Sequence, residues 1–318
     1  MQIAASYSST KSKSINFFGA LKYLELTLES TLEPYFKESS LFEAIFLGLV
    51  QGLTEFLPIS SSAHLRILGE FLPNAKDPGA AFSAITQIGT ELAVLLFFRI
   101  EIIAIIKSWF RFSILRKTNL SQEEKADNKL GWMIIIGSIP VFILGFLFQE
   151  TIKTTFRSLT LIGLMIVLFG LILGFADYMG DSAKGFKNLN VKEVILYGLG
   201  QSLALIPGVS RSGATIAVGR LMGYSRSAAT KFSFLLAVPA VLGSGLYELY
   251  QTLKDPKSEV FSMSQTLVST VVAFVVGYAV IAWLMKYIST KSYRPFVIYR
   301  LILGSAVIIG VATNFIGK

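Results

Sequence analysis

Cysteine is absent from this 318-residue sequence, and histidine occurs only once. Disulfide bonds, thiolate metal ligands and cysteine nucleophiles are therefore excluded, and so is a metal site built from several histidines. Charged residues are also scarce, at 15%, compared with about 25% in an average soluble domain. Hydrophobic residues make up 53% of the chain and form runs close to the roughly 20 residues with which a helix crosses a bilayer. The composition predicts an all-α, polytopic membrane protein.

Basic residues outnumber acidic ones, and the formal net charge is +9. A nucleic-acid partner is not needed to explain this charge, because lysine and arginine gather in the cytoplasmic loops of membrane proteins. Loops 107–129 and 286–295 hold six and three cations, whereas loops 150–157 and 251–262 hold two each. We therefore place the first two loops in the cytoplasm and the other two outside.

The apolar runs predict six transmembrane helices within a single integral membrane domain at residues 41–318. The helices are expected at residues 82–106, 130–149, 158–178, 228–250, 263–285 and 296–316. Residues 1–40 form an N-terminal extension without a signal-peptide core. Within it, residues 15–36 are either an amphipathic helix lying on the membrane or part of a dispensable extension.

Two further apolar stretches are interrupted, and we expect both to be re-entrant. The first broken segment (residues 41–70) is interrupted by Gly52 and Pro58, and the second broken segment (residues 191–222) contains Pro207. Broken backbone at membrane depth is tolerated only where protein or a water-filled cavity covers it. From the loop assignment, the first broken segment enters from outside and the second from the cytoplasm.

The two broken segments are related by a shift of 150 residues without a gap. The aligned pairs include Gly48 with Gly198, Gln51 with Gln201, Ser60 with Ser210, Ser62 with Ser212 and Phe82 with Phe232. Repeat 1 covers about residues 41–106 and repeat 2 about 191–250. Because the two units enter from opposite sides, the pattern predicts an inverted-topology repeat with a site at its interface. Chance identity in a sequence rich in leucine, glycine and serine is the alternative.

The first broken segment gathers groups that suit a cation and a nucleophile. Gln51 and Glu55 are four residues apart and share a helix face, so their oxygens are candidate ligands of Mg²⁺ or Ca²⁺. A structural carboxylate, neutralised by an arginine or by protonation, is the alternative for Glu55. Ser60 and Ser61 are either helix caps or a nucleophile, with His64 in reach as the base.

The second broken segment is suited to an anion. Gly208 lets the backbone approach a ligand closely, and a helix that begins near Ser210 directs free N–H groups at phosphate. Arg211 adds a guanidinium that fits phosphate oxygens, and Ser212 and Thr215 add hydroxyls. An arginine that extends to the membrane interface, or that pairs with Glu55, is the alternative.

Facing each other, the two segments would supply cation ligands, a hydroxyl–imidazole pair and a phosphate clamp. These groups suit phosphoryl transfer, in which positioning and charge neutralisation supply most of the catalysis. The apolar surroundings favour a substrate with a lipid tail. A transporter of a lipid phosphate is the rival hypothesis, since inverted repeats with broken helices are typical of transporters. The possible nucleophile favours an enzyme.

These residues resemble the two motifs of the undecaprenyl-diphosphatase family, also known as bacitracin-resistance proteins. The Glu/Gln-x-x-x-Glu, Phe-Leu-Pro-x-Ser-Ser and His motif is matched by Gln51, Glu55, Phe56–Pro58, Ser60, Ser61 and His64. The Pro-Gly-x-Ser-Arg-Ser-x-x-Thr motif is matched by Pro207, Gly208, Ser210, Arg211, Ser212 and Thr215. Gln87 also resembles a family position, and the resemblance covers about residues 41–316.

The resemblance implies hydrolysis of undecaprenyl diphosphate to undecaprenyl phosphate and inorganic phosphate, which recycles the lipid carrier for peptidoglycan. It also implies a divalent cation, an inverted-repeat fold, bacitracin resistance, a homodimer in the bacterial inner membrane and a catalytic cavity open to the outside. Glu55 would bind the cation beside Gln51, Ser60 or Ser61 would attack with His64 as base, and Arg211 would hold the diphosphate with Ser210 and Thr215. Gln51 is within the Glu/Gln pattern of the motif, but compared with family members that have glutamate there it leaves one fewer negative charge for the cation.

Overall fold

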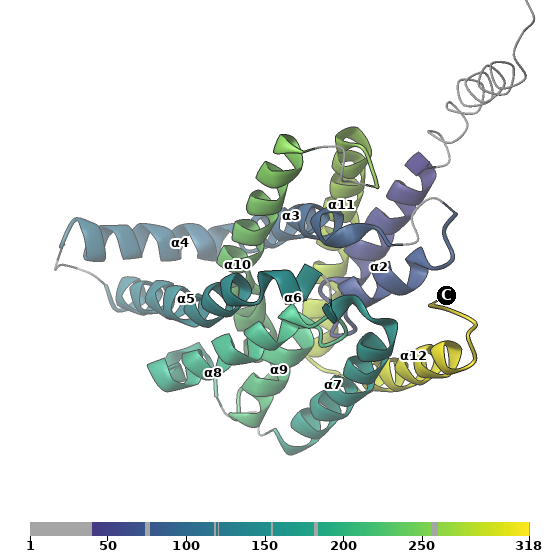
Figure 1. The fold of residues 1–318 in the computed structure, drawn as a ribbon. Coiled ribbons are helices and arrows are strands. Elements are labelled where there is room, and N and C mark those ends of the chain that lie inside the picture. The colour runs from purple at the N-terminus through teal and green to yellow at the C-terminus, as the bar shows by residue number, and fades with distance from the viewer. Residues whose placement is uncertain are drawn as a thin grey trace, which may run out of the picture.

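The computed structural model describes residues 40–73, 77–117, 119, 121–153, 155–180, 184–255 and 260–317. Within these ranges the regular elements are helices, and extended pairing is limited to one isolated bridge between Lys184 and Tyr224. The amphipathic helix expected at 15–36 lies outside the described residues. The all-α architecture is confirmed (Figure 1).

Six helices are long and apolar enough to cross a membrane, as expected. They are α3 (Gly79–Phe97), α5 (Gln122–Leu147), α7 (Leu159–Met179), α10 (Arg226–Lys254), α11 (Met263–Ile288) and α12 (Arg294–Ala312). The short elements between them are α4 (Arg99–Trp109), η1 (Phe110–Ile114), α6 (Gln149–Lys153), η2 (Thr155–Arg157) and η3 (Phe186–Asn188). The chain is therefore a multi-pass membrane protein.

The single helix expected at 82–106 is wrong, because the structure divides it at Phe98. That residue leaves helical geometry (φ −97°, ψ 22°), and α4 begins at the next residue. The Phe98 ring is buried and lies under the ammonium group of Lys231, which also pairs with Glu101 of α4. These contacts hold the start of α4 against α10, and α4 runs beside α5 (Figure 1).

Polar caps set the starts of two crossing helices, one of which hydropathy alone misplaces. Helix α5 begins eight residues before the expected position because Ser121 and Glu124 form a capping box, in which each side chain accepts from the other residue's backbone N–H. Ser262 and Gln265 form the same box at the start of α11. Capping of this kind satisfies N–H groups that have no partner within the helix.

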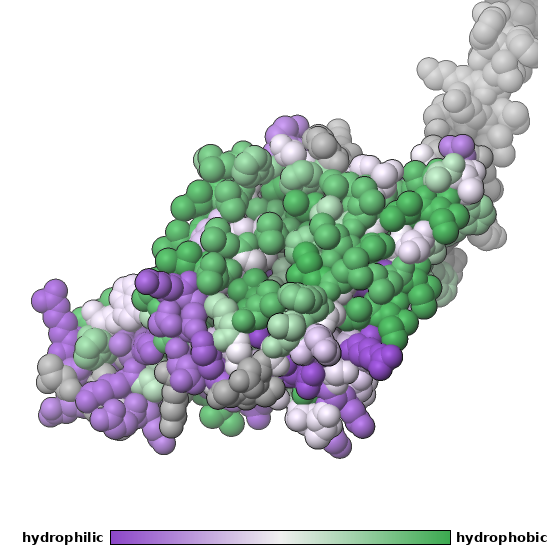
Figure 2. All heavy atoms as spheres, turned by 90° about the horizontal axis from the view of Figure 1, so that it is seen from below, coloured by the Kyte–Doolittle hydropathy of each residue, from purple (hydrophilic) through white to green (hydrophobic). Residues whose placement is uncertain are grey.

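The outer surface is largely apolar. Ile100, Phe146 and Val271 are among the many large hydrophobic side chains that point away from the protein. Figure 2 shows a broad hydrophobic surface, with hydrophilic residues gathered toward the end where α4 and α5 are joined. An exposed apolar surface of this extent would be unfavourable in water, so we expect lipid to cover it.

The first broken segment consists of a helix at Ser40–Thr54, an irregular stretch at 55–60 and α2 (Ser61–Gly69). Pro58 lies in the irregular stretch, as expected. The expectation that Gly52 also interrupts the helix is wrong, since this residue is helical. Its lack of a side chain serves packing instead, because a Cβ atom there would lie 2.7 Å from Cβ of Val276 in α11.

The second broken segment consists of α8 (Val191–Ser202), η4 (Leu203–Leu205), an irregular stretch at 206–210 and α9 (Arg211–Leu221). Gly208 adopts φ +97°, a conformation that residues with a Cβ rarely adopt. A Cβ there would also lie 2.6 Å from the carbonyl oxygen of Ile162 in α7. Glycine therefore permits both the turn and its close approach to α7.

The start and end of the first broken segment lie at the same end of the bundle. Ser40 accepts a hydrogen bond from Gln265 at the start of α11, and Asp77, just beyond the segment, pairs with Arg157, the last residue of η2, which directly precedes α7. Partial burial acts to raise the pKa of Asp77, but hydrogen bonds from Arg157 outweigh it and hold the pKa below its ordinary value.

The start and end of the second broken segment also lie together, at the opposite end of α7. The carboxylate of Glu193 accepts hydrogen bonds from Lys184 and from Tyr224 (2.8 and 2.6 Å). Arg220 pairs with Asp177, which lies at the end of α7. The two segments thus approach the middle of the bundle from opposite ends, an arrangement that an inverted pair of re-entrant segments predicts. The inverted repeat itself stays a prediction.

Candidate active site

The two irregular stretches, which we call the tips, contact each other directly. The backbone N–H of Gly208 donates to Oγ of Ser60 (3.2 Å), and Oγ of Ser212 donates to the carbonyl oxygen of Leu57 (3.2 Å). Each tip therefore satisfies a polar group of the other. Residues about 150 positions apart in the chain meet here, as the sequence predicts for a site between two broken segments.

Arg300, on α12, ties both tips to the bundle. Its side chain is fully buried, and its guanidinium donates to five carbonyl oxygens from three parts of the chain. These oxygens belong to Pro58 (3.0 Å), Gly208 (2.8 Å), Val209 (3.1 Å), Ile166 (3.0 Å) and Met165 (3.3 Å). Irregular backbone has carbonyls without a partner in a helix, and a buried arginine supplies the missing donors.

Ser60 and Ser210, which the 150-residue shift aligns, share an unusual backbone conformation. Both have positive φ, at 74° and 70°, and both immediately precede a helix, α2 and α9 respectively. Positive φ is uncommon outside glycine and costs on the order of 1–3 kcal/mol, so it persists only where surrounding contacts impose it. The repetition of this strain at matched positions supports both the repeat and a functional role for the tips.

Glu55 is the centre of the site, and we call its side chain the central carboxylate. It is buried, and it accepts hydrogen bonds from Nε2 of Gln51 (2.6 Å), Oγ of Ser61 (2.5 Å) and Nη2 of Arg211 (2.7 Å). Nε2 of Gln87, on α3, lies 3.4 Å away. The predicted site residues Gln51, Glu55, Ser61 and Arg211 are therefore in contact.

Arg211 reaches the central carboxylate from the first residue of α9. This is the pairing with Glu55 that the sequence left open as an alternative. Its second terminal nitrogen, Nη1, makes no hydrogen bond to the described part of the chain and lies 3.6 Å from Oε2 of Glu91. The pairing uses one side of the guanidinium, so the other side has donors for a further anion.

Glu91, on α3, was not identified from the sequence. It is fully buried, and neither carboxylate oxygen has a hydrogen-bond partner among the described residues. One signal was present: an acidic residue in the middle of an apolar crossing helix, four positions after Gln87. Ionisable groups at such positions are functional candidates by default.

His64 does not make the expected contact with a serine hydroxyl. Its Nδ1 lies 2.7 Å from the carbonyl oxygen of Ser60, and its Nε2 lies 2.7 Å from the hydroxyl of Tyr299. A carbonyl only accepts, so in the neutral ring Nδ1 carries the proton and Nε2 accepts from Tyr299. The helical position of His64 directs the ring toward α12 and away from the serines. The role of His64 as the base stays a prediction.

The hydroxyls of the predicted phosphate clamp bond to the protein itself. Oγ of Ser210 accepts from the N–H of Gly213 (3.1 Å) and caps α9. Thr215 lies one turn inside α9, where Oγ1 donates to the carbonyl oxygen of Arg211 (2.8 Å) and contacts Ser233. Their role as substrate ligands stays a prediction, and Arg211 is the member of the clamp with an unused donor.

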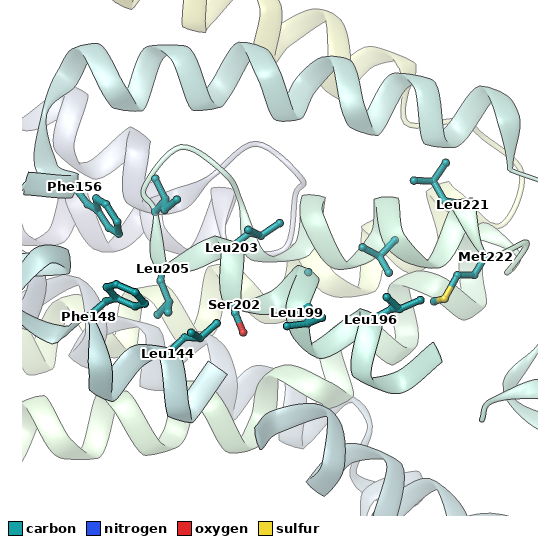
Figure 3. A pocket seen from close by; sticks show the side chains of 13 residues that line it. Leu144, Phe148, Phe156, Leu196, Leu199, Ser202, Leu203, Leu205, Leu221 and Met222 are labelled. Atoms are coloured by element: carbon teal, nitrogen blue, oxygen red, sulfur yellow. The ribbon is translucent and has the colours of Figure 1, made fainter. Parts of the chain in front are cut away.

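The cavity of about 650 Å³ beside the second broken segment is not this site. It lies between α5, α8, η4 and α9 and is lined almost entirely by apolar side chains (Figure 3). Ser202 contributes a hydroxyl, but that group donates to the carbonyl oxygen of Gly198. None of the lining side chains is ionisable, so this cavity has no means of binding a diphosphate.

The chain matches the family described as "Bacitracin resistance protein BacA" over residues 44–306. It belongs to this family. It is 59% identical to the undecaprenyl-diphosphatase of Micrococcus luteus over 263 residues, which cover 82% of this chain and 94% of that protein. It is also 52% identical to the undecaprenyl-diphosphatase of Paenarthrobacter aurescens (86% and 98% covered) and to undecaprenyl-diphosphatase 2 of Agrobacterium fabrum (82% and 92%). The residues matched by the family include both tips and Arg300.

Proposed function

We propose that this protein hydrolyses undecaprenyl diphosphate to undecaprenyl phosphate and inorganic phosphate. The observation that carries the proposal is the contact of Ser61, Glu55 and Arg211 at the junction of the two tips. A hydroxyl, a carboxylate that can take its proton and a phosphate-binding guanidinium are the groups that phosphoryl transfer needs. The relatives named undecaprenyl-diphosphatase supply the identity of the substrate.

The 2.5 Å hydrogen bond from Ser61 to Glu55 makes Ser61 the better placed of the two candidate nucleophiles. Its Oγ would attack the terminal phosphorus and release undecaprenyl phosphate, while its proton passes to Glu55. Water, with His64 as its base, would then hydrolyse the phosphoserine, release inorganic phosphate and restore the hydroxyl. Arg211 would hold the oxygens of the terminal phosphate, where negative charge must be stabilised. Oγ of Ser60 is engaged by the N–H of Gly208, which favours a structural role for it.

The side-chain oxygens of Gln51 and Glu55 fit a hard divalent cation such as Mg²⁺ or Ca²⁺. Carboxylate and amide oxygens are its preferred ligands, and Oε1 of Gln51 is buried with no hydrogen-bond partner among the described residues. Gln51 and Glu55 would hold the cation from one face of the first helix. When bound, the cation would neutralise phosphate charge and make the terminal phosphorus more electrophilic.

We further propose that the protein lies in the bacterial inner membrane as a homodimer, with its site open to the outside. The charge distribution among the loops supports this orientation. In this setting, the reaction would recycle the lipid carrier for peptidoglycan synthesis and confer resistance to bacitracin. Because the natural chain has no cysteine, Glu150→Cys should react with an impermeant maleimide in intact cells, whereas Lys125→Cys should not.

Phosphate release from C55 and C15 prenyl diphosphates by the purified protein in detergent tests the activity. We expect release with Mg²⁺ or Ca²⁺, its loss in EDTA, and a fall of at least about 100-fold in His64→Ala and Arg211→Ala, as for groups that act on the transition state. Arg294→Ala, at an exposed arginine of α12, is the control and should stay within about twofold of wild type.

No release by folded wild-type protein with any of these cations would refute hydrolysis. Lipid-phosphate transfer between vesicles would then be measured in wild type and in His64→Ala. A carrier needs the clamp and not the imidazole, so transfer that survives this substitution would support the rival transporter.

A further inference from the structure

Glu91 is buried with one long ion pair and no hydrogen bond to the described residues. Both of its oxygens lack hydrogen bonds to the described residues, and its nearest cation, Arg211, is 3.6 Å away and already bonded to Glu55. A carboxylate buried in an apolar region without hydrogen bonds is unfavourable by several kcal/mol. A bound cation would balance this charge.

Gln51 also has a buried oxygen that is unsatisfied in the described part of the chain, and it carries no negative charge. Gln51 is fully buried and donates to the central carboxylate, but its own Oε1 has no partner within the described residues. As an amide, it contributes an oxygen without the negative charge that a glutamate would bring. The tip of the first broken segment therefore offers one carboxylate, Glu55, for a cation with two positive charges.

Glu91 belongs to the same cluster as Glu55. Arg211 bridges the two carboxylates, with Nη2 on Glu55 and Nη1 near Glu91. Gln87, one turn before Glu91 on α3, lies within 3.4 Å of the central carboxylate. Two carboxylates and one guanidinium leave the cluster with a net charge of −1 when all three are ionised, so it favours a further cation.

We infer that Glu91 is the second carboxylate of the divalent-cation site, and that it supplies from α3 the negative charge that Gln51 lacks. The inference deepens the proposed function, since it names a further ligand for the cation that hydrolysis would use. Its oxygens, with those of Glu55 and Gln51, form an all-oxygen donor set that suits Mg²⁺, Ca²⁺ or Mn²⁺.

Binding of Mn²⁺ alone tests the inference apart from catalysis. Purified full-length protein in detergent is titrated with Mn²⁺, and free Mn²⁺ is counted by electron paramagnetic resonance. Glu91→Gln keeps the shape of the side chain and removes its charge, and we expect it to weaken Mn²⁺ binding at least about tenfold. The exchanged variant Gln51→Glu/Glu91→Gln moves the charge back to position 51 and should recover affinity to within about threefold of wild type.

Glu43→Gln is the matched control, because Glu43 is another buried carboxylate on the helix of Gln51 and is not in the cluster. It should leave Mn²⁺ affinity unchanged. The melting temperature without metal should not fall in Glu91→Gln, because the substitution removes a buried charge that has no hydrogen bond to the described residues. Wild-type affinity in Glu91→Gln, no recovery in the exchanged variant, or no Mn²⁺ bound by folded wild type would each overturn the inference. Mn²⁺ binding that depends on Glu91 in a protein that releases no phosphate would refute only the proposed hydrolysis.

Discussion

Arg300→Lys should both destabilise the protein and disable its site. The guanidinium makes five hydrogen bonds that span the two tips and α7, whereas an ammonium has three donors at one point and cannot reach all three. Hydrogen bonds of charged groups contribute about 1.5–3 kcal/mol each, and they are not additive. Loss of two or more, with a carbonyl left unsatisfied, corresponds to a destabilisation of about 3–5 kcal/mol. For a chain of this size the melting temperature should fall by roughly 10 °C.

The rate of phosphate release should also fall, even at temperatures where the variant is folded. The carbonyls that Arg300 holds belong to Pro58 and Gly208, so their release displaces both tips, and a shift of about 1 Å at a reacting group can lower the rate about 100-fold. Tryptophan fluorescence on heating gives the melting temperature, and phosphate release is measured well below it. Arg294→Lys, at an exposed position of the same helix, controls for the chemistry of the exchange. A variant Arg300→Lys with wild-type melting temperature and kcat would refute the reasoning.

Three further outcomes are expected. Tyr299→Phe removes the hydroxyl bonded to His64, and it should lower kcat about tenfold and alter the pH profile of phosphate release with little change in melting temperature. Asp77 has a pKa below its ordinary value of 3.8 because of Arg157. The pair should therefore stabilise the fold above about pH 4 and lose this effect as the pH falls further. Its contribution to the free energy of unfolding should be less than about 1 kcal/mol, because Asp77 is partly exposed. Melting temperatures of wild type and Asp77→Asn from pH 6 to pH 3 should converge at the acid end, and parallel curves would contradict this. Ser61→Ala should lower phosphate release at least about 100-fold if Ser61 attacks, and near-normal release would instead favour direct attack by water.

The sequence was sufficient for the features that local patterns encode. Hydropathy gave the six crossing helices, and Pro58 and Pro207 marked the centres of the two breaks. Glu55 and Arg211 were identified because a charge in an apolar segment is costly wherever it lies. Gly52 was misread as a break, since a glycine that permits helix packing and one that ends a helix look alike until the neighbouring α11 is placed.

The residues that the sequence did not reveal act across large separations in the chain. Arg300 and Tyr299 serve backbone and side-chain groups more than 90 residues away, and nothing in the local pattern of α12 indicates those partners. Glu91 is the exception, because its position inside an apolar helix was a readable signal. The actual partners of His64 could not be deduced, because helical spacing fixes which residues are near and not the direction in which a ring points.

Because both tips depend on Arg300, the site can assemble only after α12 has been synthesised. The first tip leaves the ribosome more than 200 residues before α12, and the second about 90 residues before it. Both must therefore enter the membrane with carbonyls whose donor has not yet been made. Transient water, lipid headgroups or insertion factors have to satisfy them in the interval. Assembly of the site is consequently a late event, and a nascent chain arrested before α12 would hold every motif of the sequence without a working arrangement of them.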